Sequence, residues 1–112
     1  MIARSWHGRV RAADAEVYIE YVRATGIAAF TATPGNQGSM VLRRTDGDVT
    51  HVQVMSFWDS MEAFRRFAGE TPAVPVDYPE DDRYLLEKEP RVLHFDVSVH
   101  DGGPSALRSG SD

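Results

Sequence analysis

The hydrophobic pattern changes its period near Asp59, in the middle of the chain. Residues 50–58 (THVQVMSFW) have period-two apolar positions, which are typical of a strand. Residues 61–67 (MEAFRRF) have the three-to-four spacing of an amphipathic helix. The two patterns meet without a linker. We therefore expect a strand that passes directly into a short helix, with Asp59 or Ser60 as the N-cap and Gly69 at the end.

The other elements follow from the same periodicities and from the turn residues between them. We expect a first strand at residues 2–7, a helix at 12–25 that ends at Gly26, extended chain at 27–30, a strand at 39–44, a hairpin turn at 45–48, a short helix at 79–87 and a last strand at 91–98. The resulting order is the βαββαβ pattern. It predicts an α+β, ferredoxin-like fold in which one antiparallel sheet carries both helices on one face.

The predicted sheet has apolar side chains on both faces. In the strand at 50–58, Val52 and Val54 point to one face, whereas Met55 and Phe57 point to the other. The neighbouring strands repeat this arrangement, with Met40 and Leu42 opposite Val41, and with Leu93, Phe95 and Val97 opposite Val92. Two helices cover only one face, and a large exposed apolar face is rare in a monomer. We therefore expect a homodimer in which the sheet faces pack together.

Composition narrows the choice of partners and chemistry. The 112 residues fit one domain, and 12 basic against 17 acidic side chains give a net charge of −5. We expect neither nucleic acid nor a membrane as a partner, because the sequence has no basic run and no apolar segment of membrane length. The absence of cysteine excludes thiolate catalysis and disulfides. The expected organisation is one cytoplasmic domain at residues 1–100, followed by a disordered tail at 101–112.

Several motifs together carry a resemblance to a known family. The run 55–67 (MSFWDSMEAFRRF) resembles the signature of the antibiotic biosynthesis monooxygenase family, and residues 34–38 (PGNQG) match the family's Pro-Gly-x-x-Gly before the second strand. Residues 78–81 (YPED) and 89–95 (EPRVLHF) resemble a subset of its small members. The resemblance covers about residues 1–98. It implies a dimeric α/β barrel, with cofactor-independent oxygenation of aromatic polyketides or heme degradation as known family activities.

Heme degradation is not what these residues indicate. The heme-degrading branch of the family uses an Asn on the first strand, a Trp on the second helix and a His just after that helix as the iron ligand. In this chain the first strand has no Asn, the helix position holds Phe67, and the ligand position falls near Asp77. His94 or His7 could bind iron only at a different site. We therefore expect no cofactor and no metal.

Cofactor-independent oxygenation requires a pocket for an electron-rich phenol and a group that favours the phenolate, which can pass an electron to oxygen. We expect His94 to be the catalytic base, because it alternates away from Leu93 and Phe95 on the last strand. The candidate substrate-binding residues are Trp6, His7, Trp58, Phe64, Phe67 and Tyr84. Further candidates for the pocket are Arg4, His51, Asp77 and Tyr78.

Structural roles compete with these assignments. Trp58 lies at a strand–helix corner, where a core role is common, and Phe64 and Phe67 have the helical spacing of core residues. His94 fits a buried structural histidine as well as a base. Three functions stay open: a monooxygenase of a small aromatic or polyketide-like metabolite, a non-catalytic dimer that binds a small hydrophobic ligand, and a cyclase or isomerase with His94 as base. A ligand site near His94 and the second helix would usually measure several hundred cubic ångströms.

Overall fold

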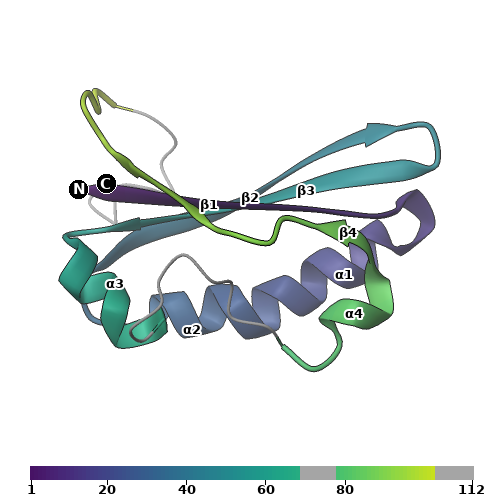
Figure 1. The fold of residues 1–112 in the computed structure, drawn as a ribbon, viewed down its shortest axis with the longest axis horizontal. Coiled ribbons are helices and arrows are strands. Elements are labelled where there is room, and N and C mark those ends of the chain that lie inside the picture. Colours follow the sequence, from purple (N-terminus) through teal and green to yellow (C-terminus); the bar gives the residue numbers. More distant parts are fainter. Residues whose placement is uncertain (69–77, 103–112) are drawn as a thin grey trace.

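The computed structural model describes residues 1–68 and 78–102, and of Ala68 only the backbone. One antiparallel sheet consists of β1 (Ile2–Arg11), β2 (Asn36–Asp46), β3 (Val49–Trp58), β4 (Leu85–Lys88) and β5 (Leu93–Asp96). The helices of the described part lie on one face of this sheet (Figure 1). The α+β, ferredoxin-like architecture expected from the sequence is therefore confirmed.

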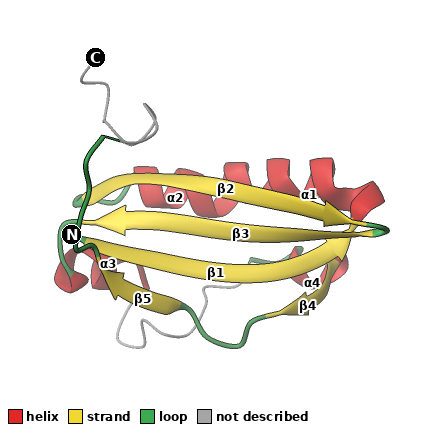
Figure 2. Ribbon diagram, turned by 90° about the horizontal axis from the view of Figure 1, so that it is seen from above, coloured by secondary structure: helices red, strands yellow, loops and turns green. Residues whose placement is uncertain are grey.

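β1 is the central strand of the sheet. Along one edge it pairs with β3, from Ile2 opposite Trp58 to Arg11 opposite Val49, and β3 pairs in turn with β2. Along its other edge β1 pairs with β5 near its start and with β4 near its end (Figure 2). The hairpin between β2 and β3 turns at Gly47, where φ is +63°, as the Asp-Gly pair predicted.

The segment before the last strand differs from the single helix predicted at 79–87. The helix α4 (Asp81–Tyr84) is one turn long, and the chain then forms β4. Without β4, the edge of β1 at Gly8–Val10 would leave backbone N–H and C=O groups unpaired. Hydrogen bonding at the sheet edge therefore outweighs local helix propensity here.

A continuous helical segment crosses beneath the sheet, where the sequence predicted a helix ending at Gly26 and extended chain at 27–30. That prediction was wrong. The segment comprises a 3-10 turn (Ala12–Asp14), α1 (Ala15–Val22), a π-helical turn (Arg23–Ile27) and α2 (Ala28–Thr31).

The helix passes through Gly26 because its buried face continues. Tyr18, Val22, Gly26 and Phe30 are spaced four residues apart, and all four are buried. Gly26 does not have the positive φ that a C-cap glycine adopts. The gain from burying Phe30 therefore keeps the chain helical where a glycine would otherwise end it.

The strand–helix corner follows the prediction, with one detail resolved. The helix α3 (Met61–Ala68) begins directly after β3, and the backbone N–H of Ala63 donates to Ser60 Oγ at 3.1 Å. Ser60 is therefore the N-cap, whereas Asp59 accepts a hydrogen bond from Gln37 Nε2. The predicted helix end at Gly69 lies outside the described residues.

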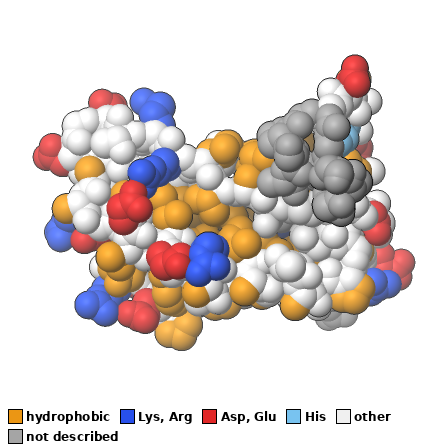
Figure 3. All heavy atoms as spheres, turned by 180° about the vertical axis from the view of Figure 1, so that it is seen from behind, with side chains coloured by type: hydrophobic (Ala, Val, Ile, Leu, Met, Phe, Trp, Pro, Cys, Tyr) orange, Lys and Arg blue, Asp and Glu red, His pale blue; other side chains and the backbone are white. Residues whose placement is uncertain are grey.

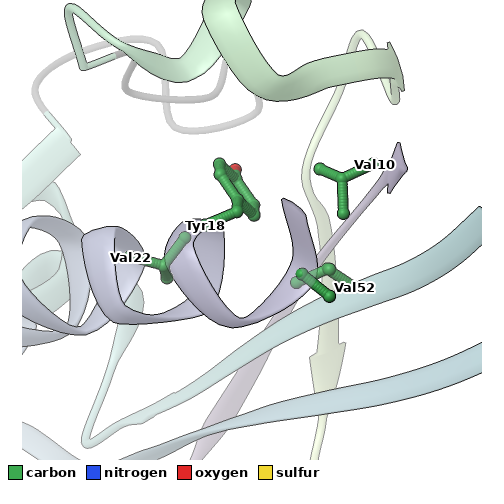
Figure 4. Packing of buried hydrophobic residues seen from close by; sticks show 5 residues of the cluster. Val10, Tyr18, Val22 and Val52 are labelled. Carbon is green, nitrogen blue, oxygen red and sulfur yellow. The ribbon is translucent and has the colours of Figure 1, made fainter. Parts of the chain in front are cut away.

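The core between sheet and helices has two clusters. In the first, Val10 of β1 and Val52 of β3 pack against Tyr18 and Val22 of α1 (Figure 4). The second contains Phe30, Trp58, Ala63 and Phe64. Trp58 is completely buried, and its indole N–H donates to Ser56 Oγ at 2.9 Å. These contacts give Trp58 a structural role at the corner between β3 and α3.

The sheet face away from the helices is apolar at one end and polar at the other. Near the start of β1 it carries Leu93 and Phe95, which are 60% and 51% exposed. Near the end of β1 it carries His7, His51 and Gln53, which are half-buried. We call this surface the open face. The predicted apolar character of the uncovered side therefore holds for about half of its length.

Three further observations concern the surface seen from behind, membrane-spanning helices and the predicted C-terminal tail. Hydrophobic side chains also gather in the middle of the surface seen from behind, with charged side chains around them (Figure 3). None of the helices in the described ranges is long and apolar enough to cross a membrane. The tail predicted at 101–112 lies outside the described residues from position 103 onward.

Candidate functional site

A cavity of about 70 Å³ lies between the sheet and the long helical segment. At about 10–15 Å³ for each water, it has room for roughly five water molecules, which is comparable with a molecule of one aromatic ring. The cavity is smaller than the several hundred cubic ångströms expected from the sequence. Its lining residues are Arg4, Trp6, Tyr18, Val22, Thr25, Gly26, Phe30, Val54, Phe67, Tyr78, Asp81 and Val92.

The hollow exists because one helical position lacks a side chain. Gly26 occupies the buried helix face between Val22 and Phe30. A Cβ built on Gly26 would meet only the ring of Tyr78, at 3.8 Å, which is an ordinary contact. The glycine therefore leaves space in the core layer, and π-helical turns of this kind are often found at functional sites.

Arg4 places a positive charge at the wall of this cavity. Its side chain points to the helix side of β1 and is only 6% exposed. The guanidinium carbon lies 4.6 Å from the centre of the Phe64 ring, 5.7 Å from that of Phe30 and 5.8 Å from that of Phe67. Such cation–π contacts offset part of the cost of burying the charge.

Within the described residues, no carboxylate pairs with the Arg4 guanidinium. Its Nε is buried without a hydrogen-bond partner, and no carboxylate within residues 1–68 or 78–102 forms an ion pair with it. Burial lowers the pKa of Arg4 from 12.5 to about 10, while Tyr78 acts in the opposite direction. Arg4 therefore remains a cation at neutral pH, although burial disfavours its charge.

Trp6 and His94 carry two further buried nitrogens that lack partners among the described residues. Trp6 lines the cavity, and its Nε1 is an unused donor. His94 of β5 is paired with Arg4 of β1 in the sheet, so the two side chains lie on the same face. Burial, and then the Arg4 charge, lower the pKa of His94, so its imidazole is neutral at pH 7.

Asp81 holds the start of α4 against the long helix. Its Oδ2 accepts from the backbone N–H of Tyr78 at 2.8 Å, and its Oδ1 accepts from the Tyr18 hydroxyl at 3.4 Å. Burial, and then Asp81, raise the pKa of the Tyr78 phenol. Tyr78 therefore remains protonated at neutral pH and can donate a hydrogen bond.

The structure separates the candidate residues into four groups. Trp6 and Phe67 line the cavity, and Phe64 and His94 lie next to Arg4, with their ring centres 4.9 Å apart. Trp58 lies in the core, as described above. The remaining two, His7 and Tyr84, do not line the cavity.

His7 and Tyr84 have other neighbours. On the open face, His7 Nε2 and His51 Nδ1 are 3.0 Å apart, and the tautomers decide which nitrogen donates. Tyr84 packs its ring against those of Tyr18 and Tyr21. Asp77, the other polar candidate, lies outside the described residues.

Sequence reasoning missed Gly26 and Asp81 as parts of the site. The signal for Gly26 was its four-residue spacing from Val22 and Phe30, which the misassigned helix end concealed. Asp81 lies near the start of the helix predicted at 79–87, and its sequence context does not mark it as a lining residue. In the described part of the chain, no group of three or more His, Asp or Glu side chains is arranged to hold a metal ion.

Comparison with known proteins identifies the fold. No protein-family model matches the chain, and no curated protein matches it significantly. Among solved structures, a Bacillus cereus protein assigned as an antibiotic biosynthesis monooxygenase has a TM-score of 0.66 and 14% identity, over 91% of this chain and 97% of the other.

Two further structures are similar over nearly the whole chain. The heme-degrader MhuD from Mycobacterium tuberculosis, with two hemes bound in its active site, has a TM-score of 0.57 and 23% identity, over 91% of this chain and 100% of the other. SnoaB, a cofactor-independent oxygenase from Streptomyces nogalater, has a TM-score of 0.55 and 20% identity, over 89% and 97%. At such identities the likeness shows the fold alone. The chain therefore shares its ferredoxin-like α+β fold with these three structures.

Proposed function

We propose that this protein is a cofactor-independent monooxygenase that oxidises a small, one-ring phenolic metabolite in the cavity beneath β1. The observation that carries the proposal is the lining of the cavity. Aromatic and aliphatic walls surround two hydrogen-bond donors, Arg4 Nε and Trp6 Nε1, which have no partner in the described part. The resemblance of residues 55–67 to the monooxygenase family and the fold shared with SnoaB support the reaction class by analogy.

The proposed reaction converts a phenol with a free para position and one O₂ into a quinone and one water. The phenol loses its hydroxyl proton, and the phenolate passes one electron to O₂. The resulting radical and superoxide join at the para carbon. Cleavage of the O–O bond with loss of hydrogen from that carbon forms the second carbonyl and releases hydroxide, which combines with the first proton. The walls exclude bulk water from these intermediates.

His94 is the proposed base in this scheme. Its imidazole is neutral, its Nε2 has no partner in the described ranges, and it lies beside Arg4. It does not line the cavity, so the proton would reach it through a water or after a side-chain movement. A His94→Gln variant with unchanged ligand affinity and a turnover loss of about 10²-fold or more would support this role.

A heme substrate does not fit the described site. A porphyrin is at least as large as the ligands for which pockets of about 300–1,000 Å³ are typical, whereas this cavity measures about 70 Å³. No histidine is among its lining residues. The described residues therefore provide neither the space nor the axial ligand that heme needs.

Non-catalytic binding of a small aromatic ligand is the second candidate, because no side chain that titrates near pH 7 lines the cavity. Oxygen uptake with simple phenols whose para position is free separates the two functions. A monooxygenase consumes one O₂ per quinone formed, above the rate of autoxidation with heat-denatured protein and in the presence of catalase. Saturable binding without oxygen uptake would contradict the enzymatic proposal.

We further propose that the open face is the contact surface of a homodimer. The exposed side chains of Leu93 and Phe95 provide its apolar end. A two-fold axis would place the same patch of each protomer against the other, so that one apolar area covers its copy. The ion pair between Arg9 and Glu87 lies at the polar end of this face.

A further inference from the structure

We propose that the cavity binds an anionic ligand, whose negative charge pairs with the Arg4 guanidinium. The ligand class is a one-ring aromatic compound with an anionic oxygen, either a carboxylate or an ionised acidic phenol. This inference rests on the proposed function for the location of the site. The prediction that the ligand is an anion can be tested whether or not the protein oxidises that ligand.

The arrangement of charges carries the first step. Four exposed arginines of the described part have carboxylate partners: Arg9 with Glu87, Arg23 with Glu20, Arg43 with Glu16 and Arg83 with Glu80. Arg4 is far more buried than these and has no such partner in the described ranges. A buried charge is costly unless it is paired. The described part of the chain thus leaves a cation unpaired where pairing would matter most.

The nearest candidate within the chain is already engaged. Asp81 is the carboxylate among the lining residues, and it accepts hydrogen bonds from Tyr18 and Tyr78. Among the described residues no ion pair joins Asp81 to Arg4, and the electrostatic influence that raises the pKa of Arg4 comes from Tyr78. The charge of Arg4 is therefore not neutralised by Asp81.

The hydrogen-bonding chemistry specifies the ligand atom. Arg4 and Trp6 point to the same face of β1 two residues apart, about 7 Å along the strand. Guanidinium and indole nitrogens only donate, so their partner must be an acceptor. An anionic oxygen is the acceptor that also supplies charge, and it forms the stronger hydrogen bonds. Phe30, Phe67 and Val54 supply the apolar walls for an attached ring.

A matched pair of probes tests the claim directly. Benzoate and benzamide have nearly the same shape and differ in charge. The chain has two tryptophans, so the two indole N–H signals in a nitrogen–proton NMR spectrum report on two places. We expect benzoate to shift the Trp6 signal saturably and to leave that of Trp58 in place, because Trp58 is hydrogen-bonded to Ser56 in the core. Benzamide should bind at least tenfold more weakly, as expected for loss of a charge-assisted hydrogen bond.

Variants identify the charge that is responsible. Arg4→Gln should weaken benzoate binding at least tenfold and benzamide binding much less, so that the preference for benzoate is lost. Arg11→Gln is the matched control, since Arg11 is exposed at the end of the same strand, and it should bind benzoate as the parent does. Arg4→Lys should keep part of the preference for benzoate. Equal affinity for the two probes, or an Arg4→Gln variant that still prefers benzoate, would overturn the proposal.

Two further comparisons complete the experiment. Binding of 4-nitrophenol, measured above and below its own pKa, tests whether a phenolate can be the anionic ligand. Tighter binding of the ionised form supports a phenolate ligand, and tighter binding of the neutral form contradicts the proposal that the cavity prefers anions.

Glu70 and Asp77 lie outside the described residues, so Glu70→Gln and Asp77→Asn test whether they supply the countercharge. Benzoate affinity should stay within about twofold in both variants. A tenfold gain in benzoate affinity in either variant would overturn the proposal. Anion selectivity without oxygen uptake would refute only the proposed monooxygenase activity.

Discussion

Arg4 and His94 are paired across β1 and β5, and both side chains point to the helix side of the sheet. The Arg4 charge lowers the pKa of His94, although burial is the larger cause. The two residues lie far apart in the sequence and form one electrostatic unit beside Phe64. Any ligand that neutralises Arg4 should therefore also make His94 easier to protonate.

The stability of Arg4 variants tests whether this residue is kept for function. Replacing Arg4 with Met removes a buried charge that has no carboxylate partner in the described ranges, and it keeps a side chain that packs on aromatic rings. We expect the free energy of unfolding of Arg4→Met to be equal to that of the parent or higher by about 1–3 kcal/mol. Denaturant titration measures it. A loss of more than about 1 kcal/mol would mean that the cation–π contacts stabilise the native state.

Filling the cavity at Gly26 should separate stability from binding. Gly26→Ala places a methyl group in ordinary contact with Tyr78 and removes a helix-interior glycine, which is about 1 kcal/mol less favourable than alanine. We expect a higher melting temperature and weaker benzoate binding, with a further loss of binding for Gly26→Leu. Unchanged benzoate affinity in Gly26→Leu would place the ligand elsewhere.

The turn glycines provide a matched pair for backbone strain. Gly35 has φ of +94°, and a Cβ there would lie 2.4 Å from the Cβ of Ala63. We expect Gly35→Ala to destabilise by about 2–4 kcal/mol, because strain and overlap add. Gly47 has φ of +63° in open space, so Gly47→Ala should cost only about 1–2 kcal/mol. Equal losses in the two variants would contradict the close packing of Gly35 on α3.

The pH dependence of stability should carry a contribution from His94. Its folded pKa is lower than the unfolded value of about 6.5, so below that pH the unfolded state binds the proton first. This contribution is therefore fully present above about pH 6.5 and is lost as the pH falls towards the folded pKa. A His94→Gln variant should show a smaller loss of stability on acidification below pH 6.5 in denaturant titrations. The same dependence of unfolding free energy on pH in both proteins would show that this contribution does not come from His94.

Substitutions on the open face test the homodimer. Phe95→Glu places a charge in the proposed contact at a position that is 51% exposed in the protomer, so it should disrupt assembly and spare the fold. Val17→Glu, on α1 and 56% exposed, is the control on the opposite side of the sheet. Light scattering at micromolar concentration should give a dimer for the parent and for Val17→Glu, and a monomer for Phe95→Glu. A monomeric parent would refute the proposal.

Sequence patterns anticipated those parts of the fold that depend on neighbours in the chain. The hairpin at Gly47 and the corner from β3 through Ser60 into α3 arise from local turn chemistry and capping. The alternation in β3 also correctly placed Met55 and Phe57 on the face opposite to that of Val52 and Val54. The same patterns brought Trp6 and Phe67 forward as pocket residues, and both line the cavity.

The tertiary structure decided what depends on distant partners. Gly26 continues a helix because the burial of Phe30 outweighs its local tendency to end one, and β4 forms because β1 offers an unpaired edge. The state of Arg4 is a third case, since an arginine in a strand is usually exposed and only the packing of Phe30, Phe64 and Phe67 encloses it. The sequence by itself determined the alternation of strands and helices, because neighbouring residues set periodicity. The cavity and its buried charge exist only where segments remote in sequence meet, because burial is a property of the assembled core.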